Sequence, residues 1–236
     1  MNRPAILRAI PLCALLGGCI ASPPWETGAT PKAKALDYPV CSDTAVIEDA
    51  EDGDNRTVVQ DGRGGYWFTF TDSNGSRIEP QGSFTMSSPG RAGSKGAARM
   101  HGKIGTIGEY FYAGMGVSIA DPRGPYDASD FSGVSFWAKG PGRIRFEMPD
   151  GNTAPEGGVC KDCYNDFGIY LSLEADWNRY TIPFEWLSQR SGWGEPHPEL
   201  DQKRVIAMEW EFNGAGRDFD IWIDDIAFVC NPEDYE

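Results

Sequence analysis

Two cysteines separated by two residues, Cys160 and Cys163, stand in the stretch GGVCKDCYNDFG. The Cys-x-x-Cys spacing occurs in thiol redox centres, in halves of zinc sites and in short disulfide loops. Redox centres place the pair at the start of a helix beside a βαβ unit, whereas here a predicted strand follows at Phe167. A zinc site would need two more ligands. If the protein is exported, the spacing therefore predicts a small disulfide loop.

Two glutamates, Glu209 and Glu211, lie on one face of the predicted strand AMEWEF, about 7 Å apart at two residues' rise. Paired carboxylates at this range serve glycoside hydrolases as acid and nucleophile, or as acid and base. Here Trp210 stands between them and Phe212 and Asn213 follow, so no third acid joins the pair. Solvent-facing glutamates on a half-exposed strand are the alternative that we favour, and we expect a protein without catalytic activity.

The last apolar stretch, DFDIWIDDIAF, contains an aspartate where a strand would be apolar. Period-two alternation places Asp224 on the same face as Trp222 and Phe228. A carboxylate among large apolar side chains must be paired or bound to a cation, because isolated burial costs too much. Residues 46–54, VIEDAEDGD, add further acids if the two ends of the domain lie together. Such an oxygen-rich cluster suits Ca²⁺, and a solvated acidic edge that blunts the terminal strands is the alternative.

The composition argues against several other kinds of site. The two histidines, His101 and His197, are far apart in sequence, which argues against a His-based zinc site or a Ser-His-Asp triad. There is no Gly-x-Ser-x-Gly nucleophile elbow. Acidic residues number 35 against 21 basic ones, a formal net charge of −14. This charge argues against nucleic acid or another anionic polymer as partner.

Residues 1–18 carry two arginines, a short apolar run and small residues before Cys19, which is typical of an export signal. The stretch LGGC resembles a bacterial lipobox. This resemblance implies that Cys19 becomes the first mature residue and carries acyl chains, and the following Ile20 implies the outer membrane of the cell envelope. An ordinary secretory signal with an incidental Cys19 is the alternative. No other run is long and apolar enough to span a bilayer, so we expect membrane contact only through the lipid anchor.

The rest of the chain divides into three parts. Residues 19–40 are rich in Pro, Ala, Thr and Lys without periodicity and predict a flexible tether. Residues 41–231 continue without a second linker and are long enough for one domain with its own core. Residues 232–236 form a short acidic tail.

Removal of the signal and acylation of Cys19 leave four cysteines. An even number in an exported chain favours disulfides. If the ends of the domain lie side by side, Cys41 and Cys230 pair there, and Cys160 remains for Cys163.

Apolar residues alternate with period two in many short stretches, and helical periodicity is nearly absent. In YWFTFTD, for example, Phe68 and Phe70 share one face and Trp67 lies on the other. Gly, Pro, Asn and Asp separate the stretches. Many short strands at regular spacing predict an all-β fold, a β-sandwich or jelly roll. The predicted strands are YWFTFTD, GVSFWAKG, RIRFEMPD, FGIYLSLE, NRYTIPF, RVIAMEWEF and FDIWIDDIAFV.

The order of these segments over residues 45–229 resembles a carbohydrate-binding domain of the galactose-binding-like β-sandwich superfamily, nearest to the family 11 carbohydrate-binding modules. The stretches that carry the resemblance are VIEDAEDGDN, GGYWFTFTD, YDASDFSGVSFWAKG, DWNRYTIPF and DFDIWIDDIAF. It implies a jelly roll with one concave sheet and a structural Ca²⁺ that joins the first and last strands. The matching positions are Glu51 and Asp224, followed by Asp49. Ala50 departs from the pattern, which has Phe there.

Sugar binding in such modules uses flat aromatic faces against pyranose rings and Arg, Asp or Glu at the rim. We therefore predict a lipid-anchored, non-catalytic module that binds a polysaccharide or oligosaccharide. A surface protein that keeps the sandwich but binds a protein partner is the alternative. The disulfide loop is expected to hold its neighbours at the rim of the site. The candidate sugar-binding residues are Trp67, Arg145, Glu147, Tyr164, Asn165, Asp166 and Trp193.

Overall fold

The computed structural model describes residues 39–108 and 110–230, all within one compact unit. The predicted signal peptide, Cys19, residues 19–38 of the tether and the acidic tail lie outside these residues. No helix in the described part is long and apolar enough to cross a membrane. The strands there are β1 (Val46–Glu48), β2 (Trp67–Thr71), β3 (Arg77–Glu79), β4 (Ala98–Lys103), β5 (Ala113–Ser118), β6 (Gly133–Lys139), β7 (Gly142–Met148), β8 (Phe167–Leu173), β9 (Asn178–Pro183), β10 (Ala207–Phe212) and β11 (Asp218–Val229). The short 3-10 helices are η2 (Asp43–Ala45), η3 (Pro155–Gly157), η4 (Phe184–Trp186) and η5 (Gln202–Arg204).

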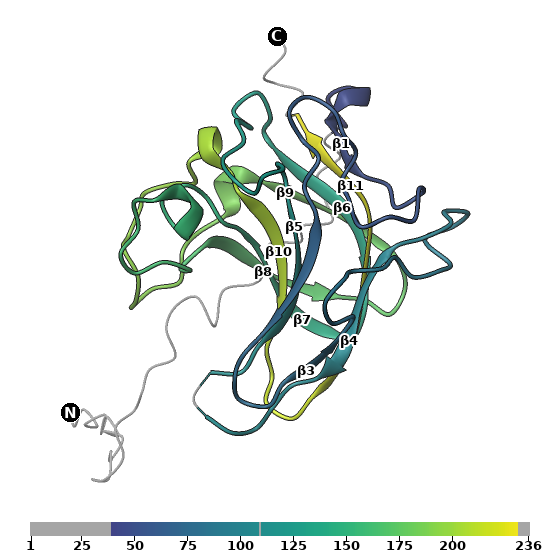
Figure 1. Ribbon diagram of the computed structural model, residues 1–236, viewed down its shortest axis with the longest axis vertical. Coiled ribbons are helices and arrows are strands. Elements are labelled where there is room, and N and C mark those ends of the chain that lie inside the picture. The colour runs from purple at the N-terminus through teal and green to yellow at the C-terminus, as the bar shows by residue number, and fades with distance from the viewer. Residues whose placement is uncertain (1–38, 109, 231–236) are drawn as a thin grey trace, which may run out of the picture. The chain divides into compact units, whose positions relative to one another are not determined.

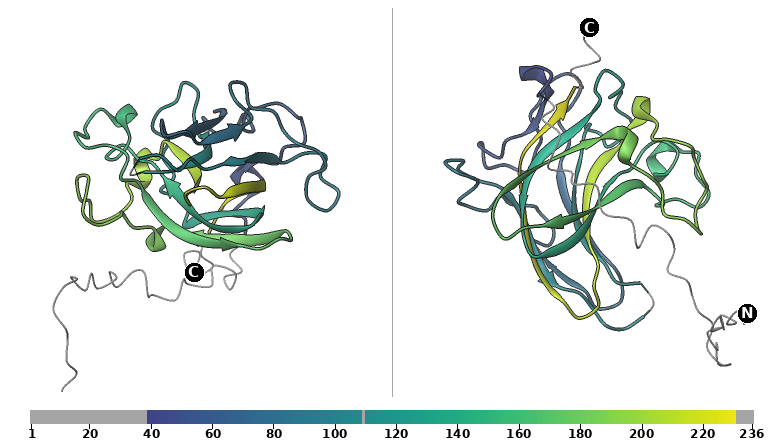
Figure 2. Two further views of the ribbon diagram at one scale, coloured as in Figure 1. Left: turned by 90° about the horizontal axis from the view of Figure 1, so that it is seen from below. Right: turned by 180° about the vertical axis from the view of Figure 1, so that it is seen from behind.

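Antiparallel pairing joins the described strands into two sheets (Figure 1). The six-stranded sheet has the order β3-β4-β11-β6-β9, with β1 pairing to β11, and the five-stranded sheet has the order β2-β5-β10-β7-β8. The sheets pack face to face around one hydrophobic core (Figure 2). Most neighbouring strands are distant in sequence, as in a sandwich built from crossing connections. The predicted all-β, jelly-roll sandwich is confirmed.

The core is filled by every second side chain of each strand. In β10, Met208, Trp210 and Phe212 are fully buried. The Trp210 ring meets Phe136 edge-on with 5.3 Å between centroids and lies 5.5 Å from Phe146. Loss of so large a buried ring costs about 3–5 kcal/mol of folding free energy. The register of β10 is therefore strongly specified, and with it the positions of the side chains on its other face.

Trp67 belongs to this core, so the prediction that it forms a sugar platform is wrong. Its side chain is only 3 % exposed, and its ring stacks on Phe84 and Trp210 at 5.3 and 5.7 Å. The indole N–H donates a hydrogen bond of 3.1 Å to Glu48. Alternation along β2 is as predicted, but it does not say which of the two faces is buried. Phe68, on the opposite face, lies outward.

The two ends of the domain lie side by side, as the first predicted disulfide requires (Figure 1). Strand β1 pairs with β11, and a disulfide joins Cys41 to Cys230, 189 residues apart in sequence. Closing a loop of this length stabilises the folded state by about 5 kcal/mol in the chain-entropy model. A second disulfide joins Cys160 to Cys163. Both predicted pairings are confirmed.

A bulge in β11 corrects the predicted surroundings of Asp224. The register of β11 against β6 shifts between Asp224 and Ala227, and Asp225 has a φ of 48°. A bulge inserts an extra residue and so exchanges the faces of the strand beyond it. Phe228 therefore points into the core, whereas Asp224 lies on the outer face and is buried there beneath the loop that contains Arg91.

Candidate functional site

Charged and aromatic side chains gather on the outer face of the five-stranded sheet. Glu209 of β10 lies opposite Glu147 of β7. The next outward residue of β10, Glu211, lies opposite Arg145. Because directly opposite side chains are about 4.5–5.5 Å apart, these groups form one surface. We call it the outer polar face, and its sheet residues are Phe68, Phe70, Glu209, Glu211, Arg145, Glu147 and Tyr170.

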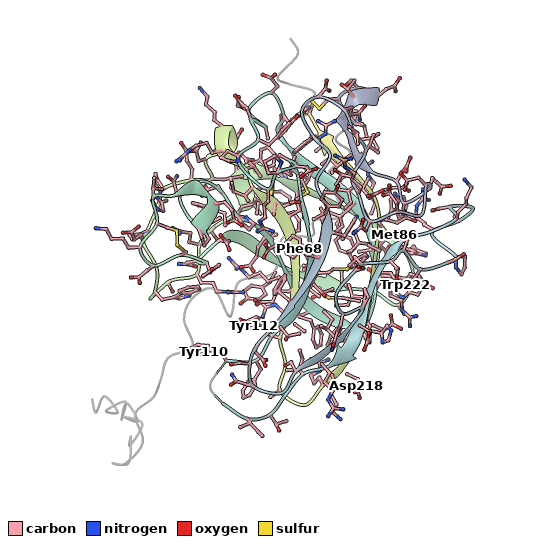
Figure 3. The ribbon with its side chains drawn as sticks, viewed as in Figure 1. Phe68, Met86, Tyr110, Tyr112, Asp218 and Trp222 are labelled. Carbon is pink, nitrogen blue, oxygen red and sulfur yellow. A yellow bond between two sulfur atoms is a disulfide. The ribbon has the colours of Figure 1, made fainter. Side chains whose placement is uncertain are left out.

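One edge of the outer polar face is aromatic, because two phenylalanines of β2 lean over glycines of β5. A Cβ atom at Gly114 would lie 2.2 Å from the Phe70 ring, and one at Gly116 would lie 2.6 Å from the Phe68 ring. The centroids of the two phenylalanine rings are 6.2 Å apart. Tyr112 extends the row 6.2 Å beyond Phe70, and Figure 3 shows Phe68 and Tyr112 along the same edge. Only glycine at these two β5 positions leaves room for the rings.

The centre of the outer polar face is a network of buried charges. Arg145 Nε lies 2.6 Å from Glu147 Oε1. Arg190, from the segment after η4, places Nη2 2.7 Å from Glu211 Oε1 and 3.3 Å from Glu147 Oε1. Burial raises the pKa of Glu147, and the charge of Glu211 raises it further against the effect of the two arginines. The network fixes carboxylate acceptors and guanidinium donors in place, which reduces the ordering cost for any polar group that binds them.

Arg123 occupies the end of the outer polar face beside Phe68. Its guanidinium lies 4.6 Å above the Phe68 ring, 2.6 Å from Glu156 and 3.4 Å from Glu209. Burial raises the pKa of Glu209 to about 7, and the charge of Asp166 contributes to this rise. Burial likewise raises the pKa of Asp166 to about 6. Carboxyl groups with pKa values displaced toward neutrality cluster at functional sites and also occur in buried ion-pair networks.

Asn165 braces two loops and is not free to serve as the predicted sugar ligand. Its side-chain NH₂ group donates to the carbonyls of Arg190 and Trp193 at 2.8 and 2.7 Å. Its side-chain oxygen accepts from the Arg190 backbone N–H at 3.0 Å. Both amide donors are therefore used within the protein, and Asn165 positions the loop that carries Arg190.

Tyr164 and Trp193 lie on these two loops and remain exposed. Tyr164 directly follows the Cys160–Cys163 disulfide and is 66 % exposed, and Trp193 is 45 % exposed. The backbone N–H of Tyr164 donates to Thr153 at 2.8 Å. The disulfide loop is therefore tied to the end of the five-stranded sheet, close to the Asp166 and Glu147 positions.

The predicted calcium ligands are only partly brought together. Asp224 accepts the backbone N–H of Arg91 at 2.8 Å, and Glu51 accepts that of Lys95 at 2.9 Å, so both carboxylates bind one loop. Asp49 instead accepts the N–H of Glu51 at 3.1 Å. Burial raises the pKa of Asp224 to about 6. Across residues 39–108 and 110–230, however, no three His, Cys, Asp or Glu side chains are grouped so as to hold a metal.

Sequence reasoning missed several members of the outer polar face. The alternate glycines of the stretch AGMGVS, Gly114 and Gly116, are the signal that would have indicated rings lying across this strand. Tyr112, just before that strand, could have been added to them. Arg123 and Arg190 come from loops, and their approach to the carboxylates follows from long-range folding without a local sequence signal.

Comparison with known proteins shows likeness of fold. No protein-family model and no curated protein matches the sequence. A solved family 11 carbohydrate-binding module of a cellulosomal cellulase of Clostridium thermocellum superposes with a TM-score of 0.57 at 15 % identity, covering 80 % of this chain and 97 % of the module. A family 30 module of another cellulosomal cellulase of that organism gives 0.53 at 15 % identity, covering 80 % and 98 %.

A third solved structure carries a sugar. It is a family 11 module from Clostridium thermocellum in complex with a β-1,3-1,4-mixed-linked tetrasaccharide, with a TM-score of 0.51 at 18 % identity, covering 70 % of this chain and 88 % of the module. The chain thus has the β-sandwich fold of the family 11 and family 30 carbohydrate-binding modules.

Proposed function

We propose that the outer polar face binds a polysaccharide or oligosaccharide without cleaving it. The observation that carries this proposal is the row of Phe68, Phe70 and Tyr112 beside fixed carboxylates and arginines on one sheet face. Pyranose rings have an apolar face and a belt of hydroxyl groups. A ligand lying along the row would bury its apolar faces on the rings, while its hydroxyls reach groups such as Glu209 and Arg190.

The solved neighbours support this class of ligand. A module with the same fold holds a β-1,3-1,4-mixed-linked tetrasaccharide. β-Glucans are therefore the first ligands to test, followed by xylans and pectins. The aromatic rings are half-buried and the ion pairs are already formed in the free protein. This arrangement favours binding to a polymer surface through several sugar units.

Affinity electrophoresis on gels containing these polysaccharides tests the proposal. We expect the full chain to be retarded on at least one β-linked polymer. Unchanged mobility on every polymer would refute the proposal. Release of reducing ends from a retarding polymer would instead support the hydrolase alternative, in which Glu209 and Glu211 act together.

A protein partner is the second candidate function, and one surface favours it. Ile107 and Tyr110, in the segment between β4 and β5, are 77 % and 74 % exposed. Large exposed apolar side chains are typical of interaction sites when they lie together. Replacing both with serine would weaken binding to such a partner and leave polysaccharide retardation unchanged, which separates the two functions.

We propose that the protein is exported and anchored in the outer membrane through Cys19, on the basis of the N-terminal sequence alone. Metabolic labelling with a fatty acid tests this directly. Label on the wild-type chain and none on the Cys19→Ser variant is the expected result. An unlabelled wild type that is released from the cell would support the ordinary secretory signal.

We also propose a structural Ca²⁺ held near the loop shared by Glu51 and Asp224. An ion there would neutralise the buried Asp224 carboxylate and tie the first strand to the last. Chelation by EDTA should then lower the melting temperature, and added Ca²⁺ should restore it. A melting temperature that does not respond to EDTA would refute the structural Ca²⁺ without affecting the sugar-binding proposal.

A further inference from the structure

The Arg123 end of the outer polar face holds more acids than bases. Four carboxylates, Asp150, Glu156, Asp166 and Glu209, surround this end, and we call them the acidic end. Arg123 binds two of them, Glu156 and Glu209. Asp150 is fully buried and accepts backbone N–H groups, including that of Asp201 at 2.8 Å. The charge of Asp150 in turn raises the pKa of Asp166.

Asp166 has a carboxylate oxygen without a partner. Its side chain is 5 % exposed, and Oδ1 makes no hydrogen bond within the described residues. Buried polar atoms normally find a donor, so an oxygen like this one marks a place where a donor is missing. Among the charges around Glu209, that of Asp166 has the largest effect on its pKa. The negative charge of Asp166 therefore acts on the more accessible Glu209.

We propose that the acidic end recognises a positively charged sugar, so that the polysaccharide bound by the outer polar face carries free amino groups, as a β-linked glucosamine polymer does. This inference rests on the proposed sugar-binding function and specifies its ligand class. Glu209 supplies the contact to the sugar ammonium, and the charge of Asp166 adds to the negative potential there. Charge-assisted hydrogen bonds of this kind are about twice as strong as neutral ones.

The chemistry and the neighbouring ring both favour a sugar ammonium. An ammonium needs only one or two acceptors. Glu209 and Phe68 both border Gly116, so that a Cβ there would meet both side chains. A sugar ring on Phe68 would thus carry its substituents to the Glu209 carboxylate.

Contact between Glu209 and the sugar amine also determines which of the two carries the proton. A protonated Glu209 that meets a neutral sugar amine transfers its proton to the amine nitrogen, which yields a carboxylate and an ammonium with no net proton exchange with solvent. Ion-pair formation then replaces two neutral groups, and the cation relieves the repulsion between Glu209 and Asp166.

Titration calorimetry with three oligosaccharides of equal length tests the inference near neutral pH. The probes are cellohexaose, the N-acetylglucosamine hexamer and the glucosamine hexamer, all β-1,4-linked and different only at C2. We expect the glucosamine hexamer to bind about tenfold more tightly than the other two, because a hydrogen bond to a charged group is stronger than one to a neutral group. Added salt should reduce this preference.

Two variants and a control locate the effect. Glu209→Gln and Asp166→Asn should each bring the ratio of the glucosamine to the cellohexaose affinity toward one, and thermal melting checks that both fold. Glu79→Gln, on the exposed end of β3 in the other sheet, should leave the ratio unchanged. Equal or weaker binding of the glucosamine hexamer would overturn the inference and leave the proposed function intact. Absence of binding by all three probes and by the polysaccharide panel would overturn both.

Discussion

The two outer faces of the sandwich use the same residue types in opposite environments. On the six-stranded sheet, the Trp222 ring lies between Arg99, 4.7 Å from its centroid, and Lys139, 4.6 Å from it. Arg99 also binds Asp220 through two hydrogen bonds of 2.8 and 2.6 Å. These side chains remain partly in water. Figure 3 shows Trp222 on the side of the molecule away from Phe68 and Tyr112.

The pKa values show what this difference means. On the six-stranded sheet, the hydrogen bond from Arg99 lowers the pKa of Asp220. On the outer polar face, burial raises the pKa of Glu209 despite the nearby Arg123. Paired charges in water keep their charged forms, whereas the same groups under loops and rings pay for lost hydration. On the outer polar face the nearby arginines do not fully offset the hydration that the carboxyl groups lose, and a bound ligand could offset more of it.

The largest expected effect concerns the pH dependence of stability. Glu209 has a pKa of about 7 in the folded state against 4.5 for an ordinary glutamate, so its contribution favours folding below pH 4.5 and is lost as the pH rises through 7. Glu209→Gln should therefore stabilise the domain at alkaline pH by up to about 3 kcal/mol. Chemical denaturation on both sides of this window measures the change. A variant less stable than the wild type at alkaline pH would contradict the assignment.

A smaller effect is expected from the disulfide beside the outer polar face. The Cys160→Ser, Cys163→Ser double variant should lose about 2 kcal/mol of stability, because the bond closes a very short loop. Binding of a retarding polysaccharide should weaken as well, since Tyr164 is then less well held. The opposite outer face offers the control, because replacing Trp222 should leave polysaccharide binding unchanged. Unaltered binding in the cysteine variant would remove the disulfide loop from the site.

The smallest effect is expected on the six-stranded sheet. Asp220 has a lowered pKa in the folded state, so its pairing stabilises the fold above the unfolded pKa and is lost as the pH falls. Asp220→Asn should cost less than about 1 kcal/mol at neutral pH and less again at high salt, because the pair is partly exposed. Denaturation at low and high salt measures this loss. Equal and large losses at both salt concentrations would show that this face is not solvated as described.

The architecture could be predicted because it depends on local patterns. Period-two alternation, turn residues and an even number of cysteines led to the sandwich and to both disulfides. Which face of each strand is buried was harder to predict. Alternation in β2 separates Trp67 from Phe68, but only packing against Trp210 decides which of them is buried. In β11, the bulge at Asp225 exchanges the two faces of the strand, whereas the alternation rule assumes a strand without a bulge.

The candidate site could be predicted only in part. Arg145 and Glu147 share the outward face of β7 as expected, since both follow from one strand's periodicity. Arg123 and Arg190 reach the same face from loops that are distant in sequence, so no local pattern places them there. Asn165 illustrates the converse, because its place after the disulfide loop can be read from the sequence, whereas the use of its amide to hold a neighbouring loop cannot.

Binding by single-ring variants tests the central claim most directly. Calorimetric titration of a retarding oligosaccharide should give at least a tenfold weaker affinity for Phe70→Ala than for the wild type. Trp222→Ala removes an aromatic ring from the opposite outer face and should bind like the wild type. Melting temperatures confirm that both variants are folded. Equal affinity of Phe70→Ala and the wild type, or a loss confined to Trp222→Ala, would contradict binding at the outer polar face.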